Sequence, residues 1–327
     1  MKKQRTLIGK SIIIAVFGLM MFSLQTYAQG DPLIQARVLA DQKEFAKAIP
    51  LYKELYDQSP ADMEVYNEYL AVLIADSKYK DAEKLAQNQL VVRQHDPMLL
   101  IDLGRVYLAW GKEKKAEEQF EKSVQFINGD DLMTSRITSG LLALKQEKFA
   151  IMAYEKAIEM MRNPFLYAIP LARLYARTGN MEKSINALLS IGPMQMPGVE
   201  DTKTTMLELL GNDPKKLQMT QKALLRKINE QPDITWYVEL LTWLYTQKGD
   251  WEGALMQIVA LDERTKEDGE RLIDFSRTAR KEKQYDIAIK ALDAIIEKGP
   301  ETPMFAVSRA ERLNVMMERL SDNPAFT

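Results

Sequence analysis

Arginine recurs in this sequence at a spacing that could build one binding surface. Arg37, Arg105 and Arg173 are equally spaced along the chain, and every one directly follows an alanine or a glycine. Further polar residues expected on the same surface are Asn67, Arg177, Arg277 and Arg280. The guanidinium group presents a planar fork of donors that suits a carboxylate. The pattern therefore predicts a surface that could bind an acidic or C-terminal segment of a partner protein.

The same arginines have a structural interpretation. Each could pair with a Glu or Asp of the next part of the chain and tie the fold together, since such pairs are common on protein surfaces. An exposed ion pair contributes only about 0–1 kcal/mol to stability, so the pairing would be modest in energy. Both interpretations stay open on the sequence alone.

Two tryptophans form a second candidate surface. Trp236 and Trp243 are seven residues apart, so they share one face of a predicted helix. Exposed tryptophan is a frequent anchor in binding sites, and such a face could serve a carbohydrate or peptidoglycan-binding module. The alternative is that both rings pack against the less regular segment that precedes them.

Catalytic chemistry is not indicated by the residues present. The chain has one histidine, His95, and no cysteine, so it has no thiol nucleophile and no cysteine metal site. It also lacks the Gly-x-Ser-x-Gly turn, the HExxH pair and the Walker A loop. We therefore expect no enzyme activity, no cofactor and no metal site.

The elements that would position the arginines are helices in pairs. Between residues 100 and 124 the sequence carries Leu103-Gly104, Tyr107, Gly111, Ala116 and Phe120. Gly104 would let two helices approach closely, and Gly111 would allow the chain to reverse in a left-handed turn. This order and spacing resemble the signature of the tetratricopeptide repeat (TPR) family.

A period of about 34 residues, which is the length of a TPR repeat, extends this resemblance along the chain. Phe45, Tyr79 and Glu113 follow it, and so do Trp251 and Tyr285. The resemblance implies an all-α fold, an α-α superhelix (TPR solenoid) of about eight helix-turn-helix repeats, whose first helices line an inner groove. We expect repeats 1–5 in 29–191, an irregular repeat and a bend in 192–232, repeats 7–8 in 233–300, and in 301–327 a helix that caps the array or begins a further repeat.

The first 28 residues resemble a secretory signal peptide. Four basic residues precede an apolar run from Ile12 to Leu24, and Thr26-Tyr27-Ala28 ends the segment with small residues at two of its last three positions. An uncleaved anchor is disfavoured because the run is shorter than the ~20 residues that a spanning helix needs. Cleavage would leave 40 basic and 46 acidic residues and no membrane span. That acidic balance disfavours nucleic acid as a partner.

These observations together predict an exported protein in the bacterial periplasm or at the periplasmic face of the outer membrane. Its expected function is that of a non-enzymatic protein–protein interaction scaffold of the cell envelope, which binds a partner peptide or protein in the groove. The alternative is the carbohydrate or peptidoglycan-binding module that would use the tryptophan face.

Overall fold

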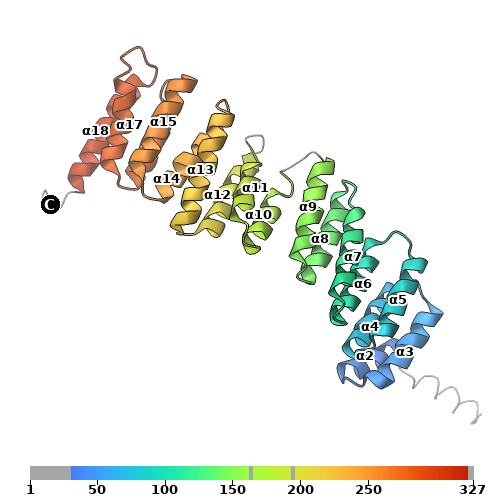
Figure 1. Cartoon of the computed structure of the whole chain (residues 1–327). Helices are drawn as coiled ribbons and strands as arrows, with labels where there is room; N and C mark the ends of the chain where they lie inside the picture. Colours follow the sequence, from blue (N-terminus) through green and yellow to red (C-terminus); the bar gives the residue numbers. More distant parts are fainter. Residues whose placement is uncertain (1–30, 162–164, 193–195, 323–327) are drawn as a thin grey trace, which may run out of the picture. The chain divides into compact units, whose positions relative to one another are not determined.

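The protein is built from α-helices joined by short turns (Figure 1). The computed structural model describes residues 31–161, 165–192 and 196–322, and within these ranges it contains helices α2 to α18 and no β-strand. The predicted all-α fold is confirmed. The predicted signal peptide, residues 1–28, lies outside the described residues.

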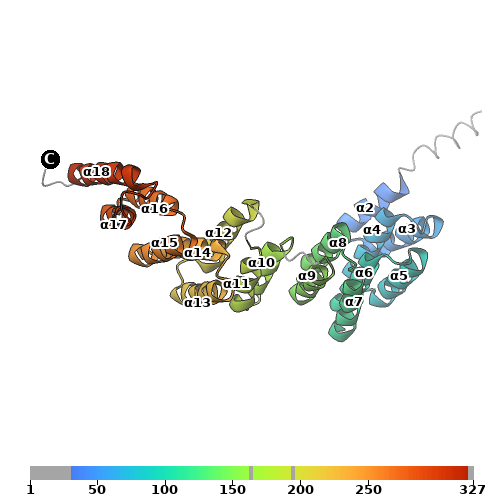
Figure 2. The ribbon, with the colours of Figure 1, turned by 90° about the horizontal axis from the view of Figure 1, so that it is seen from above.

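The chain divides into two compact units, residues 1–157 and 158–327. The helices of unit 1 are α2 (Pro32–Asp41), α3 (Phe45–Gln58), α4 (Met63–Ala75), α5 (Tyr79–Val92), α6 (Pro97–Ala109), α7 (Glu113–Gln125), α8 (Asp131–Ala143) and most of α9 (Glu147–Met161). The helices of unit 2 are α10 (Ala168–Arg177), α11 (Met181–Leu189), α12 (Met196–Leu210), α13 (Pro214–Glu230), α14 (Thr235–Gln247), α15 (Trp251–Thr265), α16 (Glu270–Lys281), α17 (Tyr285–Ile296) and α18 (Phe305–Ser321). In each unit the even-numbered helices form one layer and the odd-numbered helices form the other (Figure 2).

The turns inside the helix pairs of unit 1 repeat with the predicted period. One residue of each turn has a left-handed φ, namely Lys43 (60°), Ser77 (57°), Gly111 (73°) and Lys145 (57°). These positions follow one another at a single constant interval, which equals the predicted repeat length. The prediction that Gly111 reverses the chain is confirmed, and three other side chains adopt the same conformation at the cost that L-residues incur there.

The third helix pair shows how the two layers are held together. A Cβ atom added to Gly104 in α6 would lie 2.2 Å from the Cε1 atom of Phe120 in α7. Ala116 and Phe120 are fully buried, and Tyr107 is almost fully buried. The residues of the repeat signature therefore pack as predicted, with glycine at the closest approach of the two helices.

Aspartates begin the even-numbered helices of unit 1. The side chains of Asp31, Asp62, Asp96 and Asp130 each accept a hydrogen bond from a backbone N–H group in the first turn of the helix that follows. Such a cap satisfies one of the donors that the first turn leaves free. The start of each even-numbered helix in unit 1 is thus fixed locally.

Unit 2 contains two apolar clusters. One surrounds Leu188, Trp236 and Leu241, and the other surrounds Leu272 and Leu292. Helix α18 is the last described helix, and it packs along α17. None of the described helices combines the length and the hydropathy that crossing a membrane requires.

Candidate functional site

The even-numbered helices of unit 1 carry the first of the predicted arginines. We call the surface formed by α2, α4, α6 and α8 the first-helix face of unit 1. On it, the Nε atom of Arg37 in α2 donates to both carboxylate oxygens of Glu68 in α4 at 3.0 Å, and its Nη2 atom lies 2.6 Å from an oxygen of Glu64. The hydrogen bond that Arg37 donates to Glu68 raises the pKa of Arg37 above its ordinary value. Arg37 is therefore held by the carboxylates of the next repeat.

Three predicted arginines in unit 2 have the same kind of partner. Arg173 in α10 lies 2.8 Å from Glu208 in α12. Arg277 and Arg280 in α16 pair with α18, the first through Glu311 at 2.5 Å and the second through Glu318 at 2.6 Å. These ion pairs tie successive even-numbered helices together. Arg177 lies exposed in the last turn of α10.

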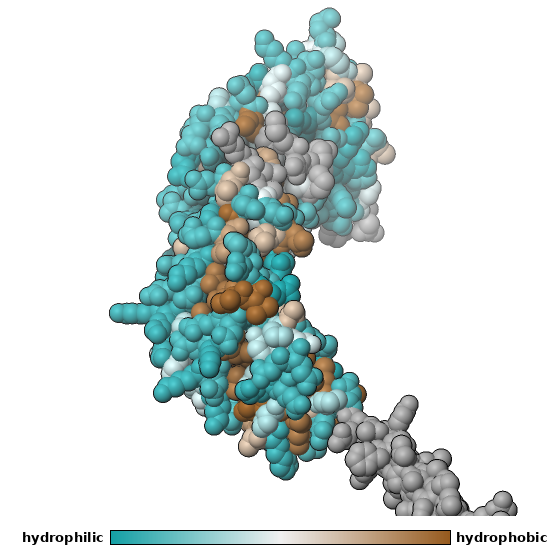
Figure 3. Space-filling view, turned by 90° about the vertical axis from the view of Figure 1, so that its right-hand side faces the viewer, coloured by the Kyte–Doolittle hydropathy of each residue, from teal (hydrophilic) through white to brown (hydrophobic). Residues whose placement is uncertain are grey.

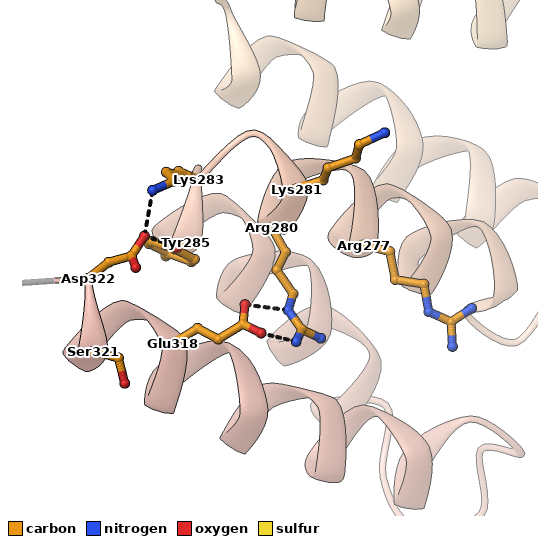
Figure 4. A pocket seen from close by; sticks show the side chains of 8 residues that line it. All are labelled: Arg277, Arg280, Lys281, Lys283, Tyr285, Glu318, Ser321 and Asp322. Atoms are coloured by element: carbon orange, nitrogen blue, oxygen red, sulfur yellow. Dashed lines mark hydrogen bonds and ion pairs between the residues drawn. The ribbon is translucent and has the colours of Figure 1, made fainter.

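The pairs between α16 and α18 border a hollow of about 490 Å³ (Figure 4). Arg280 points at Glu318, and Lys283 lies 2.9 Å from Asp322. The hydrogen bond from Arg280 lowers the pKa of Glu318, and those from Tyr285 and Lys283 lower the pKa of Asp322. The two carboxylates therefore offset part of the positive charge of the arginines and lysines that line this hollow.

Arg105 in α6 is paired differently. Its Nη2 atom lies 3.2 Å from Asp102 one turn earlier in its own helix, and its Nε atom is buried without a hydrogen-bond partner. Arg37 in α2 binds Glu68, which lies on the next even-numbered helix, α4. The residue that follows Arg105 at the same interval in the sequence is Arg136, which lies on α8. The position that holds a carboxylate, Glu68, for Arg37 thus holds a second cation, Arg136, for Arg105.

Arg136 has one partner among the described residues. Its Nη2 atom lies 3.3 Å from the Oδ1 atom of Asp96, which also caps α6 by accepting from the backbone N–H of Met98. Arg136 and His95 line a hollow of about 390 Å³ at this end of α6. A guanidinium has five N–H donors, so Arg105 and Arg136 both keep donors for a further acceptor.

Two buried polar groups lie near Arg105. Tyr66 is fully buried in α4, and burial together with the nearby carboxylate of Asp102 raises the pKa of its hydroxyl group. Burial also raises the pKa of Asp102 above its ordinary value of 3.8. Asn67, next to Tyr66, is exposed. Buried polar groups are usually satisfied, so the unpaired Nε atom of Arg105 marks a place where a ligand could complete the bonding.

The tryptophan face is not exposed. Trp236 is 3% exposed and meets the ring of Tyr237 edge-on at 5.1 Å, and Trp243 is half-buried against the same apolar cluster. The expectation of an exposed anchor at Trp236 is therefore wrong, and the carbohydrate-binding alternative loses its basis. The physical reason is that α14 packs against both α13 and α15. Its single charged residue, Glu239, was the sequence signal for a buried helix.

Catalytic and metal-binding groups are sparse in the described part of the chain. His95 is exposed and has a φ of 74° in the turn before α6. No group of three His, Asp or Glu side chains in the described residues could hold a metal ion. The residues best suited to a ligand are therefore Arg105 and Arg136, which lie on successive even-numbered helices and each have donors without a partner in the described structure.

The face drawn in Figure 3 is mainly hydrophilic, and its apolar residues form small groups. The large apolar side chains exposed in the described part of unit 1 are Ile34, Val38, Val91, Val92 and Leu132. This distribution favours recognition through polar side chains.

Sequence reasoning identified Arg105 and Asn67 but missed Arg136 and Tyr66. Arg136 could have been found by comparing the residues that stand at one fixed distance after Arg37 and Arg105, which are a glutamate and an arginine. The buried hydroxyl group of Tyr66 had no signal in the sequence, because tyrosine is a usual core residue of such repeats.

Comparison with known proteins agrees with the helix pairs. A family model for the tetratricopeptide repeat matches residues 99–128, which hold most of α6 and α7. No curated protein matches this chain.

Solved structures of low similarity also align with the chain. They include the Naa15/Naa10 complex bound to HypK (13% identity, TM-score 0.32, covering 88% of this chain and 47% of that one). Cut9–Hcn1 of the APC/C aligns with 17% identity and a TM-score of 0.26, covering 86% of this chain and 55% of that one. The C-terminal part of a TPR protein from Cytophaga hutchinsonii aligns with 16% identity and a TM-score of 0.30, covering 84% and 98%.

This chain thus spans about half the length of the first two of these structures. The stronger observations are the matched repeat, the regular recurrence of left-handed turns and the glycine at the crossing of α6 and α7. On these grounds the chain carries a tetratricopeptide repeat in α6 and α7, and the turns of the other helix pairs of unit 1 follow the same period.

Proposed function

We propose that this protein is a non-enzymatic scaffold of the bacterial cell envelope that holds a carboxylate-bearing segment of a partner protein on the first-helix face of unit 1. The TPR fold is typical of protein–protein interaction scaffolds, which supports the general class. The finer assignment depends on Arg105, because Arg136 stands where the register of Arg37 would place a carboxylate. This difference is the observation that carries the proposal.

The chemistry of Arg105 and Arg136 suits a carboxylate. Arg105 is 34% exposed on its side chain, so a ligand can reach it. A carboxylate there would take the place that Glu68 has beside Arg37, and charge-assisted hydrogen bonds of this kind contribute about 1.5–3 kcal/mol. The exposed amide of Asn67 could bind the backbone of an extended peptide. A chain terminus and an Asp or Glu side chain offer the same group, so both are candidate ligands.

The location is proposed from the sequence. The first 28 residues have the basic, apolar and small-residue parts of a signal peptide, which supports export to the periplasm or to the periplasmic face of the outer membrane. Fractionation of cells that produce the tagged protein, together with N-terminal sequencing, tests this part. A cytoplasmic protein that retains residue 1 would contradict it.

A peptide-binding experiment tests the proposed site. The purified protein is immobilised and exposed to a library of random peptides with free C-termini, and in parallel to the same library with amidated C-termini. We expect enrichment of peptides that carry a carboxylate. If only the free-terminus library is retained, the ligand is a chain end, and if acidic peptides are retained from both, it is an internal segment.

Two neutral variants provide the matched comparison. Arg105→Gln and Arg173→Gln change arginines at equivalent positions, but Arg173 is already paired with Glu208. We expect Arg105→Gln to lower retention at least tenfold, which corresponds to about 1.4 kcal/mol, and Arg173→Gln to leave it unchanged. Equal retention by both variants, or an equal loss in both, would show that the site is not at Arg105. Circular dichroism confirms that both variants are folded.

A further inference from the structure

Helix α18 presents an apolar stripe that nothing in the described structure covers. Its members share one face of the helix and are Ala306, Ala310, Leu313, Met317 and Leu320, all exposed. Leu313, Met317 and Leu320 are 61%, 66% and 54% exposed. The spacing alternates between four and three residues, which is the heptad pattern of a helix that packs along another helix. We call these five residues the α18 stripe.

The opposite side of α18 is already in use. Ser308 and Val315 are fully buried. On one flank Glu311 and Glu318 bind the arginines of α16, and on the other Arg312 and Arg319 pair with Asp293 and Asp286 of α17 at 2.5 and 2.7 Å. The orientation of α18 is thus fixed, and its stripe cannot turn inward.

The same face is covered in the preceding repeat. Leu272, Ser276 and Ala279 in α16 stand one repeat length before Ala306, Ala310 and Leu313, and all three are fully buried. The hydroxyl group of Ser276 donates to the backbone carbonyl of Ala288 in α17 at 3.1 Å. The α18 stripe therefore lies at positions equivalent to those through which α16 packs against α17.

We propose that a second copy of this chain covers the α18 stripe, with the two α18 helices antiparallel. The stripe is complementary to itself only in this orientation. With Leu313 of each copy at a two-fold axis, Ala306 lies opposite Leu320 of the other copy and Ala310 lies opposite Met317. Each small residue then faces a large one, as close packing of two helices requires. A parallel pair would set alanine against alanine and leave gaps.

Charge supports the same partner. Every charged side chain of α18 except Arg309 already has an oppositely charged partner within unit 2. Arg309 lies with its guanidinium 5.8 Å from the ring centroid of Phe305. The charged residues of α18 beside the stripe therefore include no unpaired carboxylate, and their one cation without a carboxylate partner is Arg309. In the antiparallel arrangement Arg309 faces Met316 of the other copy, so no like charges meet.

The size of the stripe sets the strength of the dimer. Its fifteen residues from Ala306 to Leu320 span about 21 Å of helix. One helix face of this length buries less than the ~800 Å² per partner of a standard stable interface. The dimer is therefore weak and reversible, and its population rises with protein concentration.

Sedimentation velocity of the purified protein from about 1 to 300 μM, the range of weak complexes, measures the association. We expect a shift from monomer to dimer across this range. Met317→Asp lowers the association at least tenfold. Met256→Asp, on α15, is the matched control because Met256 is 65% exposed outside the stripe, and it leaves association unchanged. A monomer at every concentration, or equal losses in both variants, overturns the proposal.

Cysteine cross-linking tests the orientation, and the chain has no cysteine of its own to interfere. In mild oxidant, Leu313→Cys forms a covalent dimer with itself. Met317→Cys does so poorly alone but readily when mixed with Ala310→Cys. Efficient linking of Met317→Cys to itself, with no gain on mixing, would show a parallel pair and overturn the antiparallel assignment.

Discussion

Two equivalent arginines on the first-helix face of unit 1 differ in their ion-pair partners. Arg37 is enclosed by Glu64 and Glu68, whereas the ion pair of Arg105 is with Asp102 of its own helix. Both arginines have the same position in their repeats, so the difference arises from the residue at the matching place on the next even-numbered helix, which is Glu68 in one case and Arg136 in the other. One side chain of the neighbouring repeat therefore decides whether such an arginine is enclosed by carboxylates or keeps unused donors.

The largest expected effect concerns the helix pair that presents Arg105. Gly104→Leu should destabilise the protein by about 3 kcal/mol, at the upper end of the range for overpacking, because even a Cβ atom would lie 2.2 Å from Phe120. Urea unfolding followed by circular dichroism measures the change. A neutral result would show that α6 and α7 do not cross at this glycine.

The next prediction gives Arg105 the kind of carboxylate partner that Arg37 has. Arg136→Glu places a carboxylate where Glu68 stands relative to Arg37, so it should occupy Arg105 from within the chain. Retention of carboxylate peptides should then fall about tenfold, equivalent to about 1.4 kcal/mol, while stability stays within about 1 kcal/mol of the original. If the peptides bind as before, Arg136 does not decide the availability of Arg105.

The reverse change is expected to be smaller. Glu68→Arg would remove the carboxylate that holds Arg37 and the acceptor of the Tyr52 hydroxyl group, which lies 3.1 Å away. The loss of stability should be smaller than that caused by Gly104→Leu, because the pair between Arg37 and Glu68 is only partly buried. Thermal unfolding measures it, and Glu64→Arg, which spares Tyr52, serves as the milder control. An unchanged midpoint would mean that Arg37 finds an equivalent partner.

The smallest effect is the response to acid, which should differ between Glu318, whose pKa is lowered, and the buried Asp102, whose pKa is raised. Hydrogen bonds lower the pKa of Glu318 below its ordinary value of 4.5, so its stabilising effect is present above pH 4.5 and is lost as the pH falls through the lower folded value. Burial raises the pKa of Asp102 above 3.8, so its contribution is present below 3.8 and is lost as the pH rises through the higher folded value.

Two neutral variants separate these contributions in unfolding curves recorded across pH. Glu318→Gln should reduce the loss of stability below pH 4.5. Asp102→Asn should raise stability at neutral pH and change little in acid. The same pH profile in both variants would contradict the assignment of opposite pKa shifts.

The repeat architecture was predictable because the period is carried by residue size and backbone geometry. Gly104 and Phe120 define a helix crossing that one sequence segment already contains. The turn positions Lys43, Ser77 and Lys145 lack the glycine signal, yet they follow from Gly111 by the period alone. Local chemistry and repetition were together sufficient for this part of the fold.

The candidate site was less predictable because it depends on pairs of side chains from different helices. The spacing of Arg37 and Arg105 gave their shared position, but only the contacts show that one is enclosed and the other is not. The error at Trp236 has the same origin, since helical spacing tells which residues share a face but not which neighbour covers it.

The shared use of Asp96 has a consequence for the cost of recognition. Its Oδ1 atom accepts from both the backbone of Met98 and the side chain of Arg136. If a bound carboxylate drew Arg136 away, Asp96 would keep its place at the positive end of the α6 dipole, where a negative charge is favoured. Arg136 could therefore leave Asp96 without removing the cap of α6, so ligand binding would not require α6 to move.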